Sequence, residues 1–330
     1  MVDIALAEEF AAPARSAALR RFGRSDARFR AITLGAALTV VAIFVGIMIS
    51  LISGSWLALS TFGWGFLTTS VWNPVTEKFG AFAAIYGTLV SSALAMLIAV
   101  PLGIGIAIFL TEICPRSLKR PFGIAIELLA GVPSIIYGIW GLFVFAPYFQ
   151  ANVQPALIDF FADIPILKDL FEGPPYGIGT FTASLILAVM ILPFISAVTR
   201  DVFETVPPIL KEAAYGLGST TREVMSRIVL PFARPGVVGG AMLALGRALG
   251  ETMAVTFVIG NAHHINESLF APGTTISATI ANEFTEALGD LYVSSLVALG
   301  LILFAITFIV LAAAQIMLKS LERRSGGKAS

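Results

Sequence analysis

The amino-acid sequence predicts an all-α membrane protein with six transmembrane helices and both termini in the cytoplasm. Hydrophobic residues make up 57% of the chain, and charged residues only 13%. The mean hydropathy of +0.89 lies far above that of soluble proteins. Because so few charges could not cover a soluble core, the apolar surface must be buried in lipid. Transmembrane β-strands are shorter and alternate in polarity, so the long apolar stretches favour helices.

Six stretches are long enough to cross a bilayer, which takes about 20 helical residues. We expect helices at about 31–53, 82–110, 122–149, 178–198, 236–260 and 294–318. The predicted organisation is a cytoplasmic segment (1–30), a transmembrane domain (31–320) and a cytoplasmic tail (321–330). Spans two to four carry prolines that permit kinks along a translocation path: Pro101, Pro133, Pro147 and Pro193.

The distribution of positive charge predicts the orientation. Of the 21 Lys and Arg residues, 18 fall on one side of the expected membrane, and only Lys78 and Lys168 fall on the other. The positive-inside rule therefore places the termini and the 201–232 loop in the cytoplasm. The basic, Ala-rich first 30 residues lack the pattern of a cleavable signal peptide, so span one is expected to remain as an anchor in membrane lipid. Nothing in the charge pattern suggests a nucleic-acid partner.

Two loops are expected on the outer side. Residues 150–177 are too rich in proline for a long helix. In the second loop, 261–293, apolar residues recur every four positions and predict an amphipathic helix on the membrane surface: Ile276, Ile280, Phe284 and Leu288. The only histidines, His263 and His264, lie in this loop. Two adjacent side chains rarely point at one ion, so we expect solvated loop residues rather than a metal site.

The 201–232 loop has the signals of two short helices. Pro207–Pro208 suit the first turn of a helix, and Gly218 allows a sharp turn after it. Thr220 and Glu223 form a capping-box pattern for a second helix, which Pro231 should stop. Such a helix pair could insert into a groove of a soluble partner, or could lie on lipid headgroups. The apolar surface expected for this contact comprises Val224, Met225, Ile228 and Val229.

The same loop is similar to the coupling loop of ATP-binding-cassette importer permeases. The order is Glu-Ala-Ala, three residues, Gly, nine residues, then Ile-x-Leu-Pro. The resemblance implies that a separate ATPase contacts this loop. It assigns the contact to Glu212, Ala213, Ala214, Gly218, Ile228, Leu230 and Pro231.

From span two onward the chain resembles the PstC-type permease subunit of bacterial phosphate importers. The likeness rests on 127–141, on 233–236 and above all on Gly246-Arg-Ala-Leu-Gly-Glu-Thr-Met-Ala-Val255. It implies a type I ABC importer permease fold and a role in ATP-driven import of inorganic phosphate. The expected partners are a PstA-like second permease, a PstB-like ATPase dimer and a periplasmic PstS-like phosphate-binding protein. Because no P-loop is present, we expect no cofactor and no enzymatic activity here, with ATP and Mg bound by the ATPase.

Arg247 and Glu251 are the candidate residues of the substrate path. Entry near Gly236 would place Arg247 roughly 17 Å into the membrane at 1.5 Å per residue. A charge at this depth requires a partner or water, and Glu251 would lie one helical turn away. Either the two lock the bundle as an ion pair, or Arg247 contacts an oxyanion in a central cavity. Glu127 is a weaker candidate that could instead serve as a helix contact.

Other functions remain open at the level of sequence. Within the importer class, the permease could carry sulfate, molybdate or a phosphonate, since one Arg does not identify the ion. Outside that class, a secondary transporter would need no ATPase, and a phosphate-signalling scaffold would bind a kinase complex. The spacing of the coupling loop argues against the secondary transporter.

Overall fold

The computed structural model describes residues 2–165 and 167–326. The chain divides into two compact units, Met1–Ser53 and Gly54–Ser330. A single long helix, α1 (Val2–Phe62), forms the first unit and continues into the second. Its segment Arg28–Phe62 is long and apolar enough to cross a membrane.

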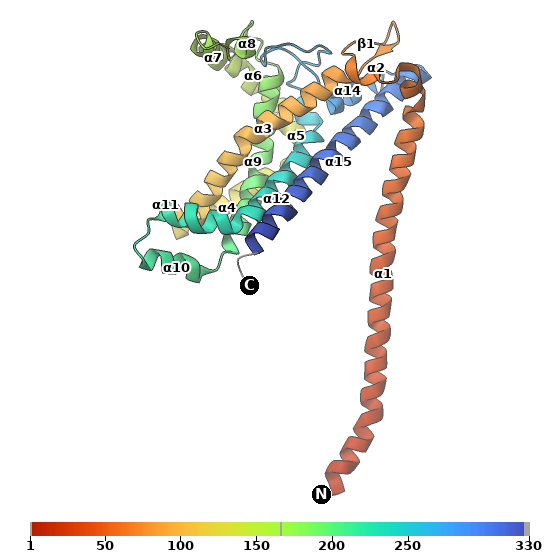
Figure 1. Ribbon diagram of the computed structural model, residues 1–330, viewed down its shortest axis with the longest axis vertical. Helices are drawn as coiled ribbons and strands as arrows, with labels where there is room; N and C mark the ends of the chain where they lie inside the picture. Colours follow the sequence, from red (N-terminus) through yellow and green to blue (C-terminus); the bar gives the residue numbers. More distant parts are fainter. Residues whose placement is uncertain (1, 166, 327–330) are drawn as a thin grey trace. The chain divides into compact units, whose positions relative to one another are not determined.

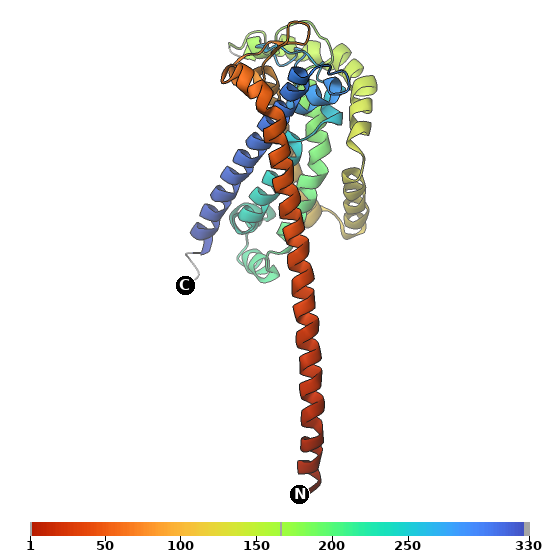
Figure 2. The ribbon, with the colours of Figure 1, turned by 90° about the vertical axis from the view of Figure 1, so that its right-hand side faces the viewer.

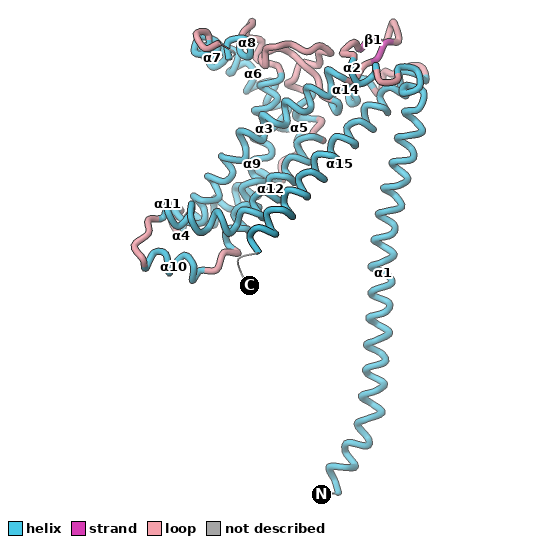
Figure 3. Tube along the Cα trace, in the orientation of Figure 1, coloured by secondary structure: helices cyan, strands magenta, loops and turns pink. Residues whose placement is uncertain are grey.

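In the described residues of the second unit, the regular structure consists of helices, one small hairpin and an isolated bridge between Gly260 and Gly273 (Figures 1 and 3). In that hairpin β1 (Trp72–Asn73) pairs antiparallel with β2 (Lys78–Phe79). The first helices are α2 (Gly65–Thr68), α3 (Phe82–Ile108) with its π-helical extension η1 (Phe109–Ile113), α4 (Arg116–Ala130), α5 (Ser134–Trp140), η2 (Gly141–Phe145), α6 (Ala146–Tyr148), η3 (Phe149–Val153), α7 (Gln154–Phe161) and α8 (Leu167–Phe171). They are followed by α9 (Thr180–Glu204), α10 (Pro208–Gly216), α11 (Thr221–Val224), η4 (Met225–Val229), α12 (Leu230–Leu249), α13 (Met253–Thr256), α14 (Ile276–Glu283) and α15 (Asp290–Gly326).

Six helices of the described residues are long and apolar enough to span a membrane, as the sequence predicted. Four agree closely with the expected ranges, but the third and fifth do not. The third runs from Ser134 to Phe161 and is preceded by a separate helix, α4. The break at 131–133 arises because Pro133 has no N–H and disfavours a helical conformation at Val132. The other three prolines of spans two to four leave their helices continuous.

The fifth span begins earlier and ends earlier than predicted, at Thr221 and Leu249. Pro231 does not stop the second short helix, which continues directly into α12. The π-helical segment η4 precedes this proline, and the amide of Leu230 donates to the carbonyl of Met225. Pro231 thus lies within a continuous helix, directly after the π-helical segment at the start of α12.

The packing of α3 against its neighbours depends on small side chains. Buried small residues recur every fourth position along α3 and form a stripe that winds around the helix: Gly87, Ser91, Ala95, Ala99, Gly103 and Ala107. A Cβ atom at Gly103 would lie 2.7 Å from Ile195 of α9, so glycine allows this close approach. The central core lies around α9, whose Ile186, Leu187 and Ile191 are fully buried.

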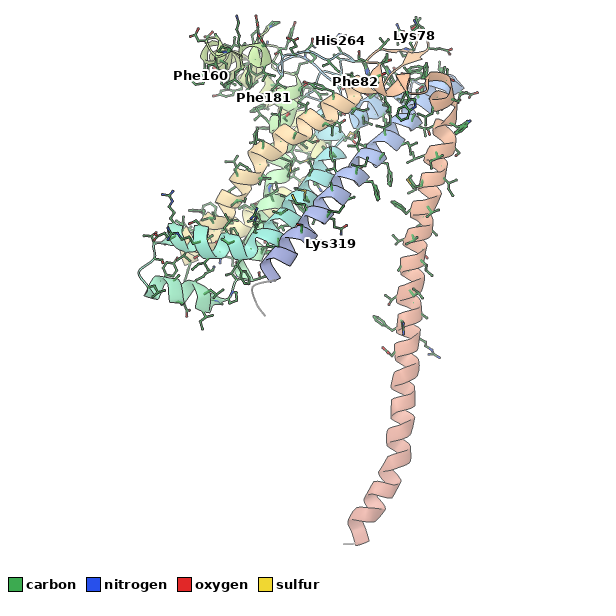
Figure 4. The ribbon with its side chains drawn as sticks, viewed as in Figure 1. Lys78, Phe82, Phe160, Phe181, His264 and Lys319 are labelled. Carbon is green, nitrogen blue, oxygen red and sulfur yellow. The ribbon has the colours of Figure 1, made fainter. Side chains whose placement is uncertain are left out.

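The connections of the second unit gather at two opposite ends, which Figures 1 and 2 show from perpendicular directions. We call them the α10 end, with α10 and α11, and the α14 end, with the hairpin, α7, α8 and α14. Figure 4 shows Lys78 and His264 at the α14 end and Lys319 at the α10 end. The helices α3, α9, α12 and α15 run between the two ends.

The helix predicted on the membrane surface is instead largely buried. In α14, Ile276 to Thr279 are buried, and the helix ends at Glu283. Thr88 of α3 accepts a hydrogen bond from the amide of Ile276 at 3.0 Å, and Thr275 caps the helix by accepting from the amide of Ala278. The four-residue repeat misled the prediction because the polar residues between its members are satisfied inside the protein. Its last two members, Phe284 and Leu288, lie beyond α14 and are exposed.

His263 is not the solvated loop residue that the sequence suggested. Its ring stacks on Trp72 with centroids 5.6 Å apart, and its Nε2 lies 2.8 Å from the Glu283 carboxylate. Tyr292 and Trp72 also donate hydrogen bonds to this carboxylate. One half-buried acid thus joins the hairpin, the 261–275 loop, α14 and α15.

The environment of Glu283 fixes the sign of a pH effect. Burial raises the pKa of this carboxyl, but hydrogen bonds from His263, Tyr292 and Trp72 lower it by more, so the pKa lies below its ordinary value of 4.5. The folded state therefore favours the ionised form. This contribution is complete above the ordinary pKa and is lost as the pH falls through the lowered pKa.

We predict that Glu283→Gln lowers the free energy of unfolding by about 1–2 kcal/mol at neutral pH, because charge-assisted hydrogen bonds are lost. Thermal melting of the purified protein should show the difference at neutral pH and a smaller one below about pH 4. Glu286→Gln, a change at an exposed neighbour, is the matched control. Equal melting temperatures for the two variants at neutral pH would contradict this account.

Candidate functional site

The first candidate region is the α10–α11 loop, whose conformation follows from two capping motifs. At the end of α10 the amide of Ser219 donates to Ala214 and that of Gly218 to Tyr215, the pattern of a Schellman motif. Gly218 has φ +85°, a conformation that side chains disfavour. Thr220 and Glu223 form the predicted capping box at the start of α11. The predicted helix, glycine turn and second helix start are confirmed.

The α10 helix has two different faces. Lys211 and Ala214, three positions apart, face the protein, and Ala214 is 6% exposed. Glu212 and Ala213 are exposed, as is Ile209 at 71%. Gly218 and Pro231 are also exposed, while Ile228 and Leu230 are half-buried. The seven residues of the coupling motif therefore divide into an accessible set and a set that holds the loop in place.

The prediction that the second short helix exposes an apolar surface is wrong. Val224, Met225 and Val229 are buried in a cluster with Ala107 of α3 and Phe203 of α9. Because the helix continues into α12, its apolar face packs on the bundle rather than projecting outward. The apolar side chains that this loop exposes belong to α10 and the turn after it: Ile209, Leu210, Tyr215 and Leu217.

The second candidate region lies where two helices are interrupted close to one another. The break at 131–133 precedes α5, and the break at 250–252 precedes α13. A Cβ atom at Gly138 of α5 would lie 2.9 Å from the carbonyl oxygen of Met253, so α5 and α13 are in close contact. Tyr137 donates to the carbonyl of Leu129 at 2.8 Å and so bridges the first break. The first break directly precedes the third candidate span and the second directly follows the fifth, and peptide groups at such helix ends can serve a ligand.

Arg247 and Glu251 lie at this second break. Arg247 occupies the last turn of α12 and is exposed in the isolated chain, near enough to Tyr137 for an electrostatic interaction. Gly250 caps the helix, so Glu251 leaves it and accepts a hydrogen bond from the amide of Ala254 at 3.1 Å. The expectation that Glu251 lies one turn along the same helix is therefore wrong. Within the described part of the chain these two residues form no ion pair.

The remaining polar candidates have structural contacts. Glu127 of α4 forms an ion pair with Arg200 of α9 at 3.0 Å, which is a helix contact. Gly246 packs beside Leu311 of α15, whereas no other element lies close to Gly250 four positions later, so of these two glycines only Gly246 faces another helix. Among the described residues, no three His, Cys, Asp or Glu side chains form a metal-binding group.

Sequence analysis missed two residues of these regions. Tyr137 was not predicted as a site residue, although a tyrosine hydroxyl inside an apolar span needs a partner and the nearby Gly131-Val-Pro133 is a signal of a helix break. Lys211 was counted only as a cytoplasmic charge. It forms an ion pair with Glu112, 99 positions earlier in the chain, and no local pattern could have shown that contact.

A model of the family described as "Binding-protein-dependent transport system inner membrane component" matches residues 99–324. The chain belongs to this family. It is therefore a multi-pass inner-membrane protein, and its six long apolar helices fit that assignment. The match includes α10, both helix breaks and Arg247.

Relatives extend the comparison over nearly the whole chain. It is 67% identical to the phosphate transport system permease protein PstC of Mesorhizobium japonicum over 94% of this chain and 95% of that one. This chain is 58% identical to the protein of the same name from Pasteurella multocida, over 91% of this chain and 93% of the relative. A crystal structure of a bacterial alginate ABC transporter has a TM-score of 0.58 at 18% identity, covering 87% and 93% of the two chains. The inward-facing methionine ABC transporter has a TM-score of 0.53 over 73% and 94%, also at 18% identity. The fold is that of an ABC importer permease.

We predict that Gly218→Val loosens the turn after α10, because a β-branched residue at positive φ costs at least about 1–2 kcal/mol. Hydrogen exchange of residues 208–224 should be faster than in the parent. Gly216→Val is the control, since both glycines have open space around them but only Gly218 has a positive φ. Equal exchange in the two variants would mean that the turn does not depend on the backbone conformation at position 218.

Proposed function

We propose that this chain is the transmembrane permease subunit of an ATP-driven importer of inorganic phosphate. The 67% identity to a phosphate permease across 94% of the chain carries the proposal. Helix breaks beside an exposed arginine supply a place where an oxyanion could pass. The chain would form half of the translocation path, with a second, PstA-like permease forming the other half.

In this proposal the α10 end faces the cytoplasm, where most of the cationic residues lie. A PstB-like ATPase dimer binds ATP and Mg and hydrolyses the ATP. In this proposal the permease chain itself binds no cofactor and catalyses no reaction. The α14 end then faces the periplasm and receives phosphate from a PstS-like binding protein. These assignments rest on the positive-inside rule and on the family resemblance.

The contact with the ATPase would be made by the outer face of α10. Ile209 and Leu217 are large apolar side chains exposed at 71% and 87%, at an end of the protein expected to meet water. Exposed apolar residues flanking a charged one are typical of helix-in-groove recognition. Glu212 is exposed between them and would fix the position of α10 in the groove.

The ion would pass Arg247. Its guanidinium group offers donors in a fixed planar fork that suits a tetrahedral oxyanion. In the structure Glu251 caps α13 rather than neutralising this arginine, so the arginine is left to other partners. In the assembled importer its exposed side chain would face the path shared with the second permease. The breaks beside it would bring peptide dipoles close to the ion.

We predict that the parent importer, reconstituted with its partners, takes up phosphate with ATP and is not inhibited by sulfate or molybdate. Arg247→Lys should lower uptake by about tenfold or more, because a point charge replaces bidentate hydrogen bonds. The double variant Arg247→Gln, Glu251→Gln should be no better than Arg247→Gln. Arg234→Lys, an exposed arginine on the same helix, is the control. Near-normal uptake by the double variant would show that Arg247 has no direct role.

We predict that Glu212→Lys reduces retention of the ATPase during co-purification, because it reverses the charge at the proposed contact. Insertion of the permease itself should be unchanged, since Glu212 touches no core residue. Glu172→Lys, an exposed acid at the α14 end, is the control and should retain the ATPase. Full retention by Glu212→Lys would place the contact elsewhere.

A further inference from the structure

The α10 helix is attached to the bundle by its inner face, and the attachment includes a charge pair. Lys211 Nζ lies 2.5 Å from Glu112 Oε1, and the two side chains are only 19% and 12% exposed. Among the ion pairs of the described residues this one is the least exposed. By contrast, Lys119–Glu204 at the same end has a separation of 3.2 Å and exposures of 42% and 50%. Exposed ion pairs contribute little to the stability of a protein. Removing one partner of a shielded ion pair costs more, because the other charge is left without compensation.

Lys211 directly precedes Glu212 in the sequence, but the two side chains point in different directions. Consecutive residues of a helix are about 100° apart, so Glu212 can face a partner while Lys211 faces the protein. A rigid helix of nine residues would therefore move both side chains together. Any displacement imposed on the outer face of α10 must pull or push on Glu112.

Glu112 belongs to the π-helical extension η1 at the end of α3. This helix crosses the whole unit, packs on α9 through its stripe of small residues, and binds α14 near its other end, where Thr88 accepts from Ile276. The same helix thus contacts α10 at one end and α14 at the other. Tight packing along α3 leaves little space to absorb a shift.

We propose that the Lys211–Glu112 pair is a positioning contact that transmits movement of α10 to α3. This inference rests on the proposed function, in which an ATPase acts on α10. The pair would work alongside the packing of Ala214 in the apolar cluster at the ends of α3 and α9. The alternative is a pair that only stabilises the fold, which would affect assembly but not the coupling between hydrolysis and transport.

The experiment measures phosphate imported per ATP hydrolysed in proteoliposomes, using complexes that co-purify with a full complement of ATPase. Lys211→Glu and Glu112→Lys should each lower this ratio by about fivefold or more, within the usual range of coupling between sites. The double reversal Lys211→Glu, Glu112→Lys should recover most of it, and Lys211→Arg should stay close to the parent. If a reversal fails to assemble, Lys211→Met and Glu112→Gln take its place, and the same fall in the ratio is expected.

Matched controls come from the exposed pair at the same end. Lys119→Glu and Glu204→Lys should leave the ratio unchanged, because that pair does not touch α10. An unchanged ratio in the Lys211 and Glu112 variants, or a double reversal no better than the single ones, would overturn the inference. Failure of the proposed function would look different, because the parent importer itself would show no ATP-driven phosphate uptake.

Discussion

Peptide groups find no hydrogen-bond partner in hydrocarbon, and this constraint governs where the chain is regular and where it is not. The spans are helical over most of their length because only a helix satisfies its own backbone. Breaks occur at 131–133, just before the third span, and at 250–252, just after the fifth, and both are compensated locally. Tyr137 binds the carbonyl of Leu129 across the first break, and Glu251 accepts from Ala254 after the second. Irregular backbone at such places is tolerated when it borders a path for a ligand, which is why Arg247 beside the second break is the natural candidate.

The two ends of the second unit are built differently. At the α14 end, a half-buried carboxylate gathers donors from three aromatic or imidazole side chains and ties four segments together. At the α10 end, an apolar cluster and one shielded ion pair hold a helix whose other face is exposed. The first arrangement keeps long connections in a fixed conformation. The second leaves a protruding element attached to the bundle at few points.

The helix α3 connects these ends because its neighbours approach it so closely. Gly103 admits Ile195, and Gly87 lies beside the carbonyl of Thr274. A larger side chain at Gly103 would push α9 away from α3, and one at Gly87 would displace the loop segment that leads into α14. Close packing also leaves α3 little room to move independently of α9 and α14.

The sequence alone determined the class of protein, the number of spans and the local conformation of the 208–224 segment. Hydropathy follows from composition, and the turn at Gly218 with the capping box at Thr220 follows from local backbone chemistry. Tertiary structure decided the contacts between residues that lie far apart in the sequence. It showed that Pro231 lies within a continuous helix, that α14 is buried against Thr88, and that His263 binds Glu283. It also separated Glu251 from Arg247 and joined Lys211 to Glu112. Local patterns act over one or two turns of helix, whereas a half-buried ion pair between residues 99 positions apart exists only once the bundle has brought them together.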